Sequence, residues 1–206
     1  MPDMLETTSF GELLAPIAER APCVDSTDGN LMPEIEILRK AGWLSACLPT
    51  NEGGKGWGSE PDGSLAALDA LRYLGRANLS VARLFEGHMN AVKLIALYAD
   101  KRQRAATFGQ ARRGALLAVW GADDPGDPLT MTVKGEEIRL SGAKRFASGL
   151  GLIDEAIVIA SDGDGGPHML LVPTDARERS DATGWRMAGM RSTPSGGYNL
   201  SGLTLS

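Results

Sequence analysis

The sequence contains little cysteine, little histidine and no long apolar run. Its two cysteines, Cys23 and Cys47, cannot form a disulfide framework, and their spacing does not suit a metal site. The two histidines, His88 and His168, have no Cys or His cluster around them, so no metal is expected. No apolar run approaches the roughly 18 residues of a membrane span, and acids near the start argue against a signal peptide. We therefore expect a soluble, cytoplasmic protein without a membrane partner.

The chain also lacks an excess of positive charge. It has 21 Lys and Arg against 26 Asp and Glu, which leaves a formal net charge of -5. This balance excludes a strongly basic nucleic-acid binder, because nothing would offset repulsion from the phosphates over a large surface. Aromatic residues make up only 5%, but 43% of the 206 residues are hydrophobic, which is enough for one or two domains with their own cores.

Apolar residues recur at helical spacing up to about residue 112. Residues typical of a helix start precede these stretches, so we expect helices to begin near Ser9, Asn30, Asp62, Asn78 and Asp100. The inward faces expected of the third and fourth helices are Leu65, Leu68, Leu71 and Leu74, and Val81, Leu84, Phe85, His88, Ala91, Val92 and Ile95. The first half of the chain is therefore predicted to be helical.

After residue 113 the apolar runs are short and separated by turns. The runs expected to form strands are 115–120, 129–133, 138–142, 156–160, 169–172 and 200–205. The turns at 135–137 and 162–167 favour antiparallel pairing of the strands that they join. The sequence therefore predicts an α+β protein, in which an N-terminal α-helical domain (1–112) is followed by a small antiparallel β-barrel or sandwich domain (113–206).

The residue chemistry by itself indicates no catalytic site. His88 lies on an apolar helix stripe, where a hydrogen-bonded core histidine is expected, and His168 is expected to be exposed. The acidic segment 123–127 is interpreted as a turn, with contact to a ligand as the alternative. The loop 53–58 has four glycines in six residues and is interpreted as a turn-rich connector. A phosphate cradle is the alternative, although the spacing matches neither a P-loop nor a dinucleotide fingerprint.

Four segments of the chain occur in an order that is familiar from one enzyme family. They are 38–44 with the loop 48–56, 74–82 at the join of two helices, 140–149 (LSGAKRFASG), and 184–196, which contains GMRSTPSG. Together they resemble the acyl-CoA dehydrogenase family of flavoproteins, in its N-terminal helical and middle β domains. The resemblance covers essentially the whole chain, and it agrees with the order of helices and strands predicted from periodicity.

The resemblance implies FAD bound at two strand ends of the β domain. The candidate cofactor-binding residues are Trp120, Gly121, Ala122 and Asp127 at the first end, and Phe146, Ala147 and Ser148 at the second. Ala122 stands where the family has a threonine that donates to the flavin, and Phe146 replaces a tryptophan. Ser148 keeps a hydroxyl at the position that, in the family, bonds near flavin N5. The alternative is that Ser148 is a strand-end serine whose hydroxyl bonds to the backbone.

The family's third domain, a C-terminal helical bundle that supplies the catalytic glutamate, has no counterpart in this sequence. The sequence ends at Gly202–Ser206, near where the resemblance places the end of the middle domain. We therefore assign no catalytic residue, and we expect low FAD affinity for this part alone. Self-association, or a complementary chain that carries the C-terminal domain, would cover the apolar helical face left exposed.

The resemblance leaves the activity open between several alternatives. The leading interpretation is α,β-dehydrogenation of an acyl-CoA, with a base from outside this chain and hydride transfer to the flavin. A reduced-flavin-dependent monooxygenase of the same fold, acting on another small molecule, is a close alternative because the usual threonine and tryptophan are replaced. A non-catalytic partner-binding module is the alternative from a different class, and a remnant without function is a third.

Overall fold

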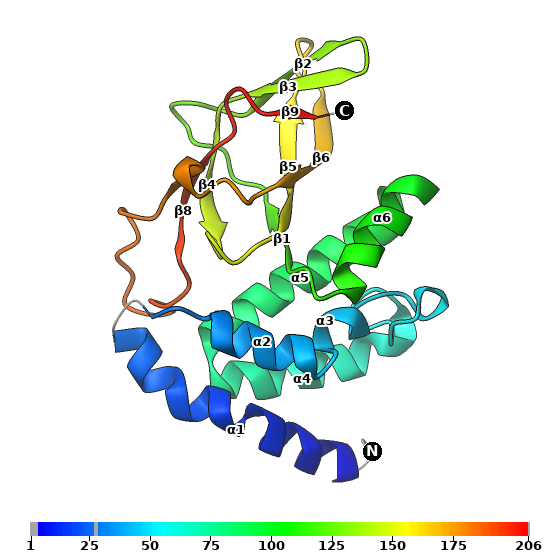
Figure 1. Cartoon of the computed structure of the whole chain (residues 1–206), viewed down its shortest axis with the longest axis vertical. Helices are drawn as coiled ribbons and strands as arrows, with labels where there is room; N and C mark the ends of the chain where they lie inside the picture. The colour runs from blue at the N-terminus through cyan, green and yellow to red at the C-terminus, as the bar shows by residue number, and fades with distance from the viewer. Residues whose placement is uncertain (1–3, 27–28, 206) are drawn as a thin grey trace. The chain divides into compact units, whose positions relative to one another are not determined.

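The computed structural model describes residues 4–26 and 29–205 and divides into two compact units (Figure 1). The helical unit comprises the chain up to Leu116 together with 187–193, and the β unit comprises Leu117–Arg186 and the chain from Pro194 onward. The segment 187–193 is held to the helical unit by the Arg191 backbone N–H, which donates to Asp25 Oδ1 at 2.9 Å. The α+β class and the order of a helical domain followed by a β domain are confirmed. The exact domain limits at 112 and 113 stay a prediction.

Local capping explains where several helices begin. The helices are α1 (Met4–Ser26), α2 (Met32–Lys40), α3 (Trp43–Ala46), α4 (Ser64–Ala77), α5 (Leu79–Tyr98) and α6 (Lys101–Arg112), and the short 3-10 helices are η1 (Thr50–Glu52) and η2 (Pro61–Gly63). Asn78 caps α5 by accepting from the N–H groups of Ser80 and Val81, and Asp100 forms a capping box with Gln103. Both predicted helix starts are confirmed.

Two other predicted helix starts are wrong. The first helix begins at Met4, so Ser9 lies within α1 and does not cap it. The third helix is preceded by η2, which places Gly63 at the N-cap position, and no side chain caps α4. Asp62 lies inside the 3-10 turn because Pro61 already sets the backbone for a tight turn one residue earlier.

The face that α4 turns inward differs from the prediction. Its buried residues are Ala67, Ala70 and Leu74, whereas Leu65 is 77% and Leu68 54% exposed. Small side chains let α4 approach its neighbours α1 and α5 closely, and this packing outweighs the larger transfer free energy of the leucines. The predicted leucine stripe is therefore wrong except at Leu74, and α4 presents apolar surface outward.

The inward face of α5 agrees with the prediction. All seven residues of the expected stripe are buried: Val81, Leu84, Phe85, His88, Ala91, Val92 and Ile95. An aromatic group completes this core, in which Trp43 packs edge-on against Trp57 and contacts Phe85. A 20-residue helix with one continuous apolar face buries most apolar surface when that face turns toward the core. The spacing of apolar residues therefore predicts which face of α5 is buried.

The β unit contains two sheets. Its strands are β1 (Leu117–Trp120), β2 (Thr130–Lys134), β3 (Glu137–Ser141), β4 (Ala143–Ser148), β5 (Glu155–Ser161), β6 (Pro167–Pro173), β7 (Ser180–Asp181), β8 (Ser195–Asn199) and β9 (Thr204–Leu205), with the 3-10 helix η3 (Arg177–Arg179) before β7. Within the described residues, one sheet has the order β1-β5-β2-β3-β9 with β6 also paired to β5, and the other has the order β4-β8-β7.

The predicted antiparallel pairing is confirmed where a short turn joins two strands. The pairs β2–β3 and β5–β6, joined at 135–136 and 162–166, are antiparallel. However, β1 pairs with β5 in parallel and β2 meets β5 in parallel, so the larger sheet is mixed and not antiparallel throughout. These neighbours are far apart in the chain, and no turn between them reveals their relative direction. The expected strand 200–205 is confirmed only at Thr204–Leu205, because residues 200–203 form a turn between β8 and β9.

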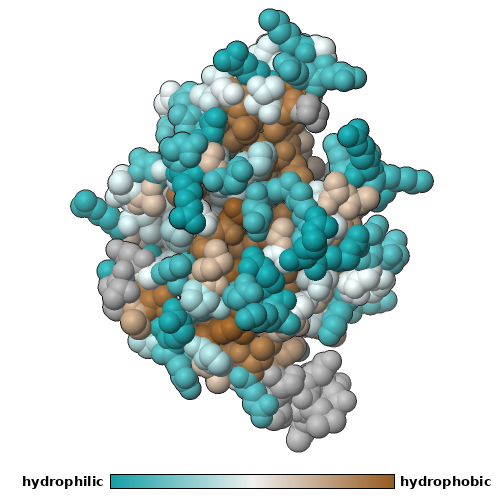
Figure 2. Space-filling view, in the orientation of Figure 1, coloured by the Kyte–Doolittle hydropathy of each residue, from teal (hydrophilic) through white to brown (hydrophobic). Residues whose placement is uncertain are grey.

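One face of the larger sheet carries apolar side chains at the surface. Figure 2 shows apolar residues gathered over β5 and β6. Cross-strand pairing puts Ile157 opposite Leu171 and Ile159 opposite Met169, and of these Ile159, Leu171 and Met169 are at least partly exposed. The β unit therefore has an apolar surface as well as a buried core.

The glycine-rich loop 53–58 is built for close contact between backbone segments. The N–H groups of Lys55, Gly56 and Trp57 donate to the backbone carbonyls of Ala46 and Leu48 at 2.9–3.1 Å. These donors are therefore occupied within the chain and do not form a phosphate cradle. The interpretation as a turn-rich connector agrees with this geometry.

Gly54→Ala is expected to lower the free energy of unfolding of the helical unit by about 2 kcal/mol or more, because an added Cβ would lie 2.0 Å from the Leu48 carbonyl oxygen. Gly53→Ala is the matched control in the same loop: its φ of +82° is unfavourable, but nothing lies within 4 Å, so about 1 kcal/mol is expected. Urea unfolding followed by helical circular dichroism measures both. Equal losses for the two variants would contradict the close-contact explanation.

Candidate functional site

The two strand ends singled out in the sequence lie side by side in the β unit. The Arg145 N–H donates to Ala122 O at 2.9 Å, and the Asp124 N–H donates to Ala143 O at 3.1 Å. The Trp120 indole Nε1–H donates to the Ser148 backbone carbonyl at 3.1 Å. Segments that are some twenty residues apart in the chain therefore form one continuous edge.

The candidate residues of the first strand end divide into one core residue and an exposed group. Trp120 is only 2% exposed, and its ring packs against Tyr198 with the ring centres 5.1 Å apart. Gly121, Ala122 and Asp127 are exposed. Within the described residues the Ala122 N–H donates no hydrogen bond, so this edge keeps a free donor. Trp120 thus positions the edge from beneath, and its side chain is not part of the exposed surface.

Phe146 is turned outward by a bulge in β4. The register between β4 and β8 shifts between Lys144 and Ala147, and Phe146 has a left-handed φ of +54°. Such a backbone costs a non-glycine residue roughly 1–2 kcal/mol, so the surrounding structure must hold it. The ring is 50% exposed, and the Arg145 guanidinium lies 4.1 Å from its centre. The bulge therefore presents a flat aromatic face beside the exposed strand edge, while Ala147 stays buried.

The hydroxyl of Ser148 lies at the end of this bulge. Ser195 Oγ, on the paired strand β8, donates to Ser148 Oγ at 3.3 Å, and Ser148 Oγ is 3.5 Å from the Phe146 carbonyl oxygen. Both distances are long for hydroxyl hydrogen bonds, and Ser148 is partly exposed. The hydroxyl therefore retains the capacity to bond a ligand. Ser195 was not found from the sequence, because nothing local links two serines 47 positions apart.

Lys144 is a buried charge that holds the site together. Its Nζ lies 2.5 Å from Asp123 Oδ1 and donates to the backbone carbonyl of Ile159 at 2.5 Å. The side chain is fully buried, whereas Asp123 is 43% exposed. The sequence offered a signal, since this lysine lies in the segment that resembles a family motif, but its clamping role was not predicted.

The other polar residues considered in the sequence have structural environments. Asp124 Oδ1 accepts from the Gly126 N–H, as expected of a turn. His88 is fully buried with Nε2 3.0 Å from Leu44 O, and burial lowers its pKa to about 4. His168 is exposed, and its Nε2 lies 2.6 Å from Asp162 Oδ2. Hydrogen bonds from His168 and the Gly166 N–H lower the pKa of that carboxyl.

The described part of the chain offers neither a metal-binding cluster nor a membrane-spanning helix. No group of three or more His, Cys, Asp or Glu residues in it could hold a metal ion. No helix among the same residues is both long enough and apolar enough to cross a lipid bilayer.

The exposed strand edge suits the rim of a flat, polar heteroaromatic ring system. The free Ala122 N–H can donate to a ring carbonyl or nitrogen, and the Phe146 ring can pack against an aromatic plane. The Ser148 hydroxyl can donate to or accept from a ring nitrogen. These groups fit the isoalloxazine of a flavin, which combines a planar tricycle with hydrogen-bonding edges.

The fold agrees with that of two solved proteins, one of which binds FMN. The FMN-bound structure of TdsC from Paenibacillus sp. A11-2 matches with a TM-score of 0.82 and 24% identity, covering 95% of this chain and 50% of that one. Methanesulfinate monooxygenase MsuC from Pseudomonas fluorescens matches with a TM-score of 0.78 and 25% identity over the whole of this chain and 52% of its own. The fold is therefore the acyl-CoA dehydrogenase-like one that the motifs indicated.

Sequence comparison finds relatives that are named as monooxygenases. The chain is 26% identical over 183 residues to a dibenzothiophene monooxygenase of Rhodococcus erythropolis, and 26% identical over 184 residues to that of Rhodococcus qingshengii. Each alignment covers 84% of this chain but 43% of the relative, so the chain spans about half the length of the relatives it matches. No protein-family model matches the chain. These relatives favour the monooxygenase alternative over acyl-CoA dehydrogenation, and they support a flavin without singling out FAD.

Proposed function

We propose that this chain forms the flavin-binding portion of a reduced-flavin-dependent monooxygenase. The observation that carries the proposal is the pairing of the two strand ends into one edge with a free N–H, an outward aromatic ring and a hydroxyl. Similarity to monooxygenases, one of them solved with FMN, supports the same function. We take FMN as the cofactor in place of FAD.

The residues proposed to hold the flavin are those predicted from the sequence. Gly121, Ala122 and Asp127 would line one edge of the ring through backbone and carboxylate groups, with Trp120 supporting them from the core. Phe146 would face the plane of the ring, the buried Ala147 would support this strand end from the core, and Ser148 would bond near N5. A reduced flavin held by these residues would supply two electrons to molecular oxygen and end oxidised, so that one oxygen atom would go to the substrate and the other would leave as water.

The proposed substrate is a small molecule with an oxidisable heteroatom. Dibenzothiophene and methanesulfinate, which name the enzymes similar to this chain, both present sulfur. The rest of the enzyme, in the same or a complementary chain, would complete the binding site for the flavin and the substrate. It would also cover exposed apolar side chains such as Leu65 and Leu68 of α4. We keep 1–112 and 113–206 as the proposed domains.

Flavin and substrate assays test this function directly. The purified chain, alone and with any complementary half, is titrated with FMN and with FAD while flavin fluorescence is followed. The bound flavin is then reduced without oxygen, and oxygen is added together with dibenzothiophene. We expect FMN binding and an oxygenated product. Bleaching of oxidised flavin by an acyl-CoA without oxygen would support the dehydrogenase instead, and failure to bind either flavin would support the non-catalytic module.

Ser148→Ala is expected to weaken FMN binding about fivefold, because one hydrogen bond to the flavin is lost. A shift of the flavin absorption maximum is also expected, since the polarity near N5 changes. Ser141→Ala serves as the control, because Ser141 is exposed on β3 of the same unit. Unchanged affinity and an unchanged spectrum for Ser148→Ala would refute the assignment of this hydroxyl.

A further inference from the structure

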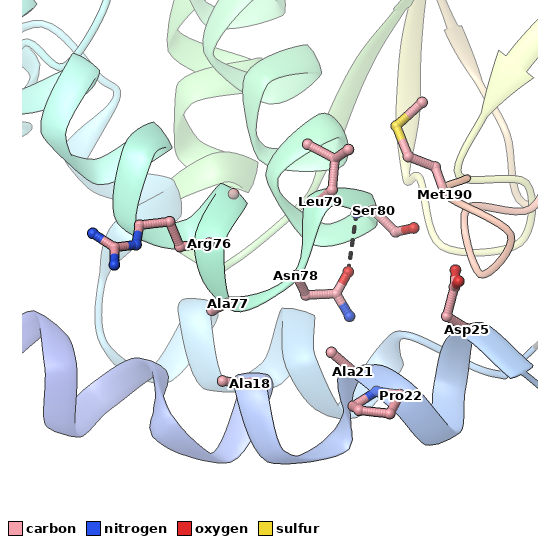
Figure 3. A pocket seen from close by; sticks show the side chains of 11 residues that line it. Ala18, Ala21, Pro22, Asp25, Arg76, Ala77, Asn78, Leu79, Ser80 and Met190 are labelled. Atoms are coloured by element: carbon pink, nitrogen blue, oxygen red, sulfur yellow. Dashed lines mark hydrogen bonds between the residues drawn. The ribbon is translucent and has the colours of Figure 1, made fainter. Parts of the chain in front are cut away.

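We propose that the helical unit contains a binding pocket for a compact, uncharged organic molecule that carries one hydrogen-bond acceptor. The pocket has a volume of about 410 Å³ and lies between α1, the junction of α4 and α5, and Met190 (Figure 3). This volume is within the range of small-molecule sites and suits one or two rings. All its lining residues belong to the helical unit, and the proposal does not depend on flavin binding.

The walls of the pocket are small or apolar on both sides. The lining residues of this kind are Ala18, Ala21 and Pro22 on α1, Gly75, Ala77 and Leu79 at the helix junction, and Met190. Ala18 and Leu79 are exposed, so water now contacts apolar surface that a ligand would bury. Such walls favour a ligand with an apolar body.

Two buried polar side chains lie in the middle of these walls. Asn78 is 7% and Ser80 2% exposed. The Asn78 Oδ1 is occupied by the N–H groups that it caps, so the amide nitrogen is left to donate, and Figure 3 shows it directed toward α1. Within the described residues, neither this nitrogen nor the Ser80 hydroxyl makes a hydrogen bond. Neither atom is sealed from solvent, so the acceptor of a ligand in the pocket can reach them and take the hydrogen bond that water would otherwise make.

The charges at the pocket favour a neutral ligand. Arg76 and Asp25 carry opposite charges, and Figure 3 shows the Arg76 side chain pointing away from Asn78 and Ser80. Asp25 Oδ1 already accepts from the Arg191 N–H. An anion would meet the Asp25 carboxylate, and a cation would find two hydrogen-bond donors at the centre. An uncharged acceptor such as a ketone, amide or sulfoxide avoids both conflicts.

Met190 gives the pocket one adaptable wall. Its backbone has a left-handed φ of +53°, and the Thr193 N–H donates to its carbonyl at 3.1 Å. The unbranched thioether can change rotamer to fit ligands of different outline. The shape of the apolar body is therefore less tightly specified than the position of the acceptor.

Binding of 1-indanone and indane to the intact chain tests the proposal, because the two probes share a bicyclic skeleton and only the first has an acceptor. Protein NMR follows the Asn78 side-chain amide during titration. We expect a dissociation constant below about 1 mM for 1-indanone, and binding of indane weaker by about fivefold. Ser80→Ala should reduce this preference to about twofold or less. Equal affinities for the two probes, or an Asn78 amide signal that does not move, would overturn the proposal.

Ala18→Leu blocks the pocket from an exposed helix position, where folding is not at risk. We expect it to weaken binding of both probes by at least about tenfold, since the leucine occupies the volume of the ligand body. Ala105→Leu, at an exposed position on α6 outside the pocket, is the matched control and should bind both probes like the unmodified chain. Undiminished binding to the Ala18 variant would place the probes elsewhere and refute the site.

Discussion

Replacing Lys144 by methionine is expected to lower the free energy of unfolding of the β unit by about 3 kcal/mol. The fully buried Nζ joins Asp123 Oδ1 and the Ile159 carbonyl, each at 2.5 Å. Methionine keeps the length and apolar volume of the side chain but cannot donate, so both acceptors lose this charged donor, and Asp123 Oδ1 keeps only the hydrogen bond from the Leu129 N–H at 3.2 Å. Because Asp123 is 43% exposed, water solvates part of its charge, which keeps the loss at the low end of the range for broken buried pairs.

Hydrogen exchange measured by mass spectrometry reports this loss separately for the β unit. Peptides from β4 and β5 should exchange faster in Lys144→Met, while peptides from α5 should not change. Lys134→Met, at the exposed end of β2, is the control and should stay within about 0.5 kcal/mol of the unmodified protein. FMN binding should also weaken in Lys144→Met alone, since this lysine holds the proposed flavin edge. Equal hydrogen exchange and equal FMN binding in the two variants would contradict the proposed role of Lys144 in holding these strand ends together.

Acid is expected to destabilise the helical unit through His88, by up to roughly 3 kcal/mol. Burial lowers the pKa of His88 to about 4 in the folded protein, from an ordinary 6.5. Between these values the unfolded chain binds a proton that the folded chain does not. The stability contributed by neutral His88 is therefore fully present above about pH 6.5, and it decreases as the pH falls toward 4.

Denaturant unfolding at several pH values between 7 and 4.5, followed by helical circular dichroism, measures this effect. His88→Gln is expected to be less stable at pH 7 but to lose much less stability on acidification, because its amide can still donate to the Leu44 carbonyl and does not titrate. His168→Gln is the comparison variant, since His168 is exposed, and it should keep the acid loss of the unmodified chain. If His88→Gln loses as much stability on acidification as the unmodified chain, groups other than His88 cause that loss.

The helices could be predicted from the sequence as far as their signals are local. Asn78 and Asp100 cap helices through bonds that reach only two or three residues, so the sequence contains the whole interaction. The inward face of α5 was also predictable, because it has one apolar stripe. For α4 the choice between an alanine face and a leucine face depended on how closely α1 and α5 approach, which no local pattern contains.

The same distinction applies to the strands and to the candidate site. Hairpins at 135–136 and 162–166 follow from turn residues, whereas the parallel pairing of β1 with β5 depends on chain segments far apart. The motifs singled out the candidate flavin residues but did not predict that Trp120 would be buried or that a bulge would turn Phe146 outward. The pocket beside Asn78 and Ser80 was not predicted, since its walls come from three separate stretches of chain.

By itself the sequence determined the α+β order, the caps of two helices, the core face of α5 and the turns of two hairpins. Each of these depends on hydrogen bonds or periodicity within a few residues. Only the tertiary structure decided the outward leucines of α4, the mixed sheet, the pairing of Ser148 with Ser195 and the burial of Lys144. These features arise from close packing between distant segments, where the size and hydrogen bonds of a partner elsewhere in the chain set the free energy of each arrangement.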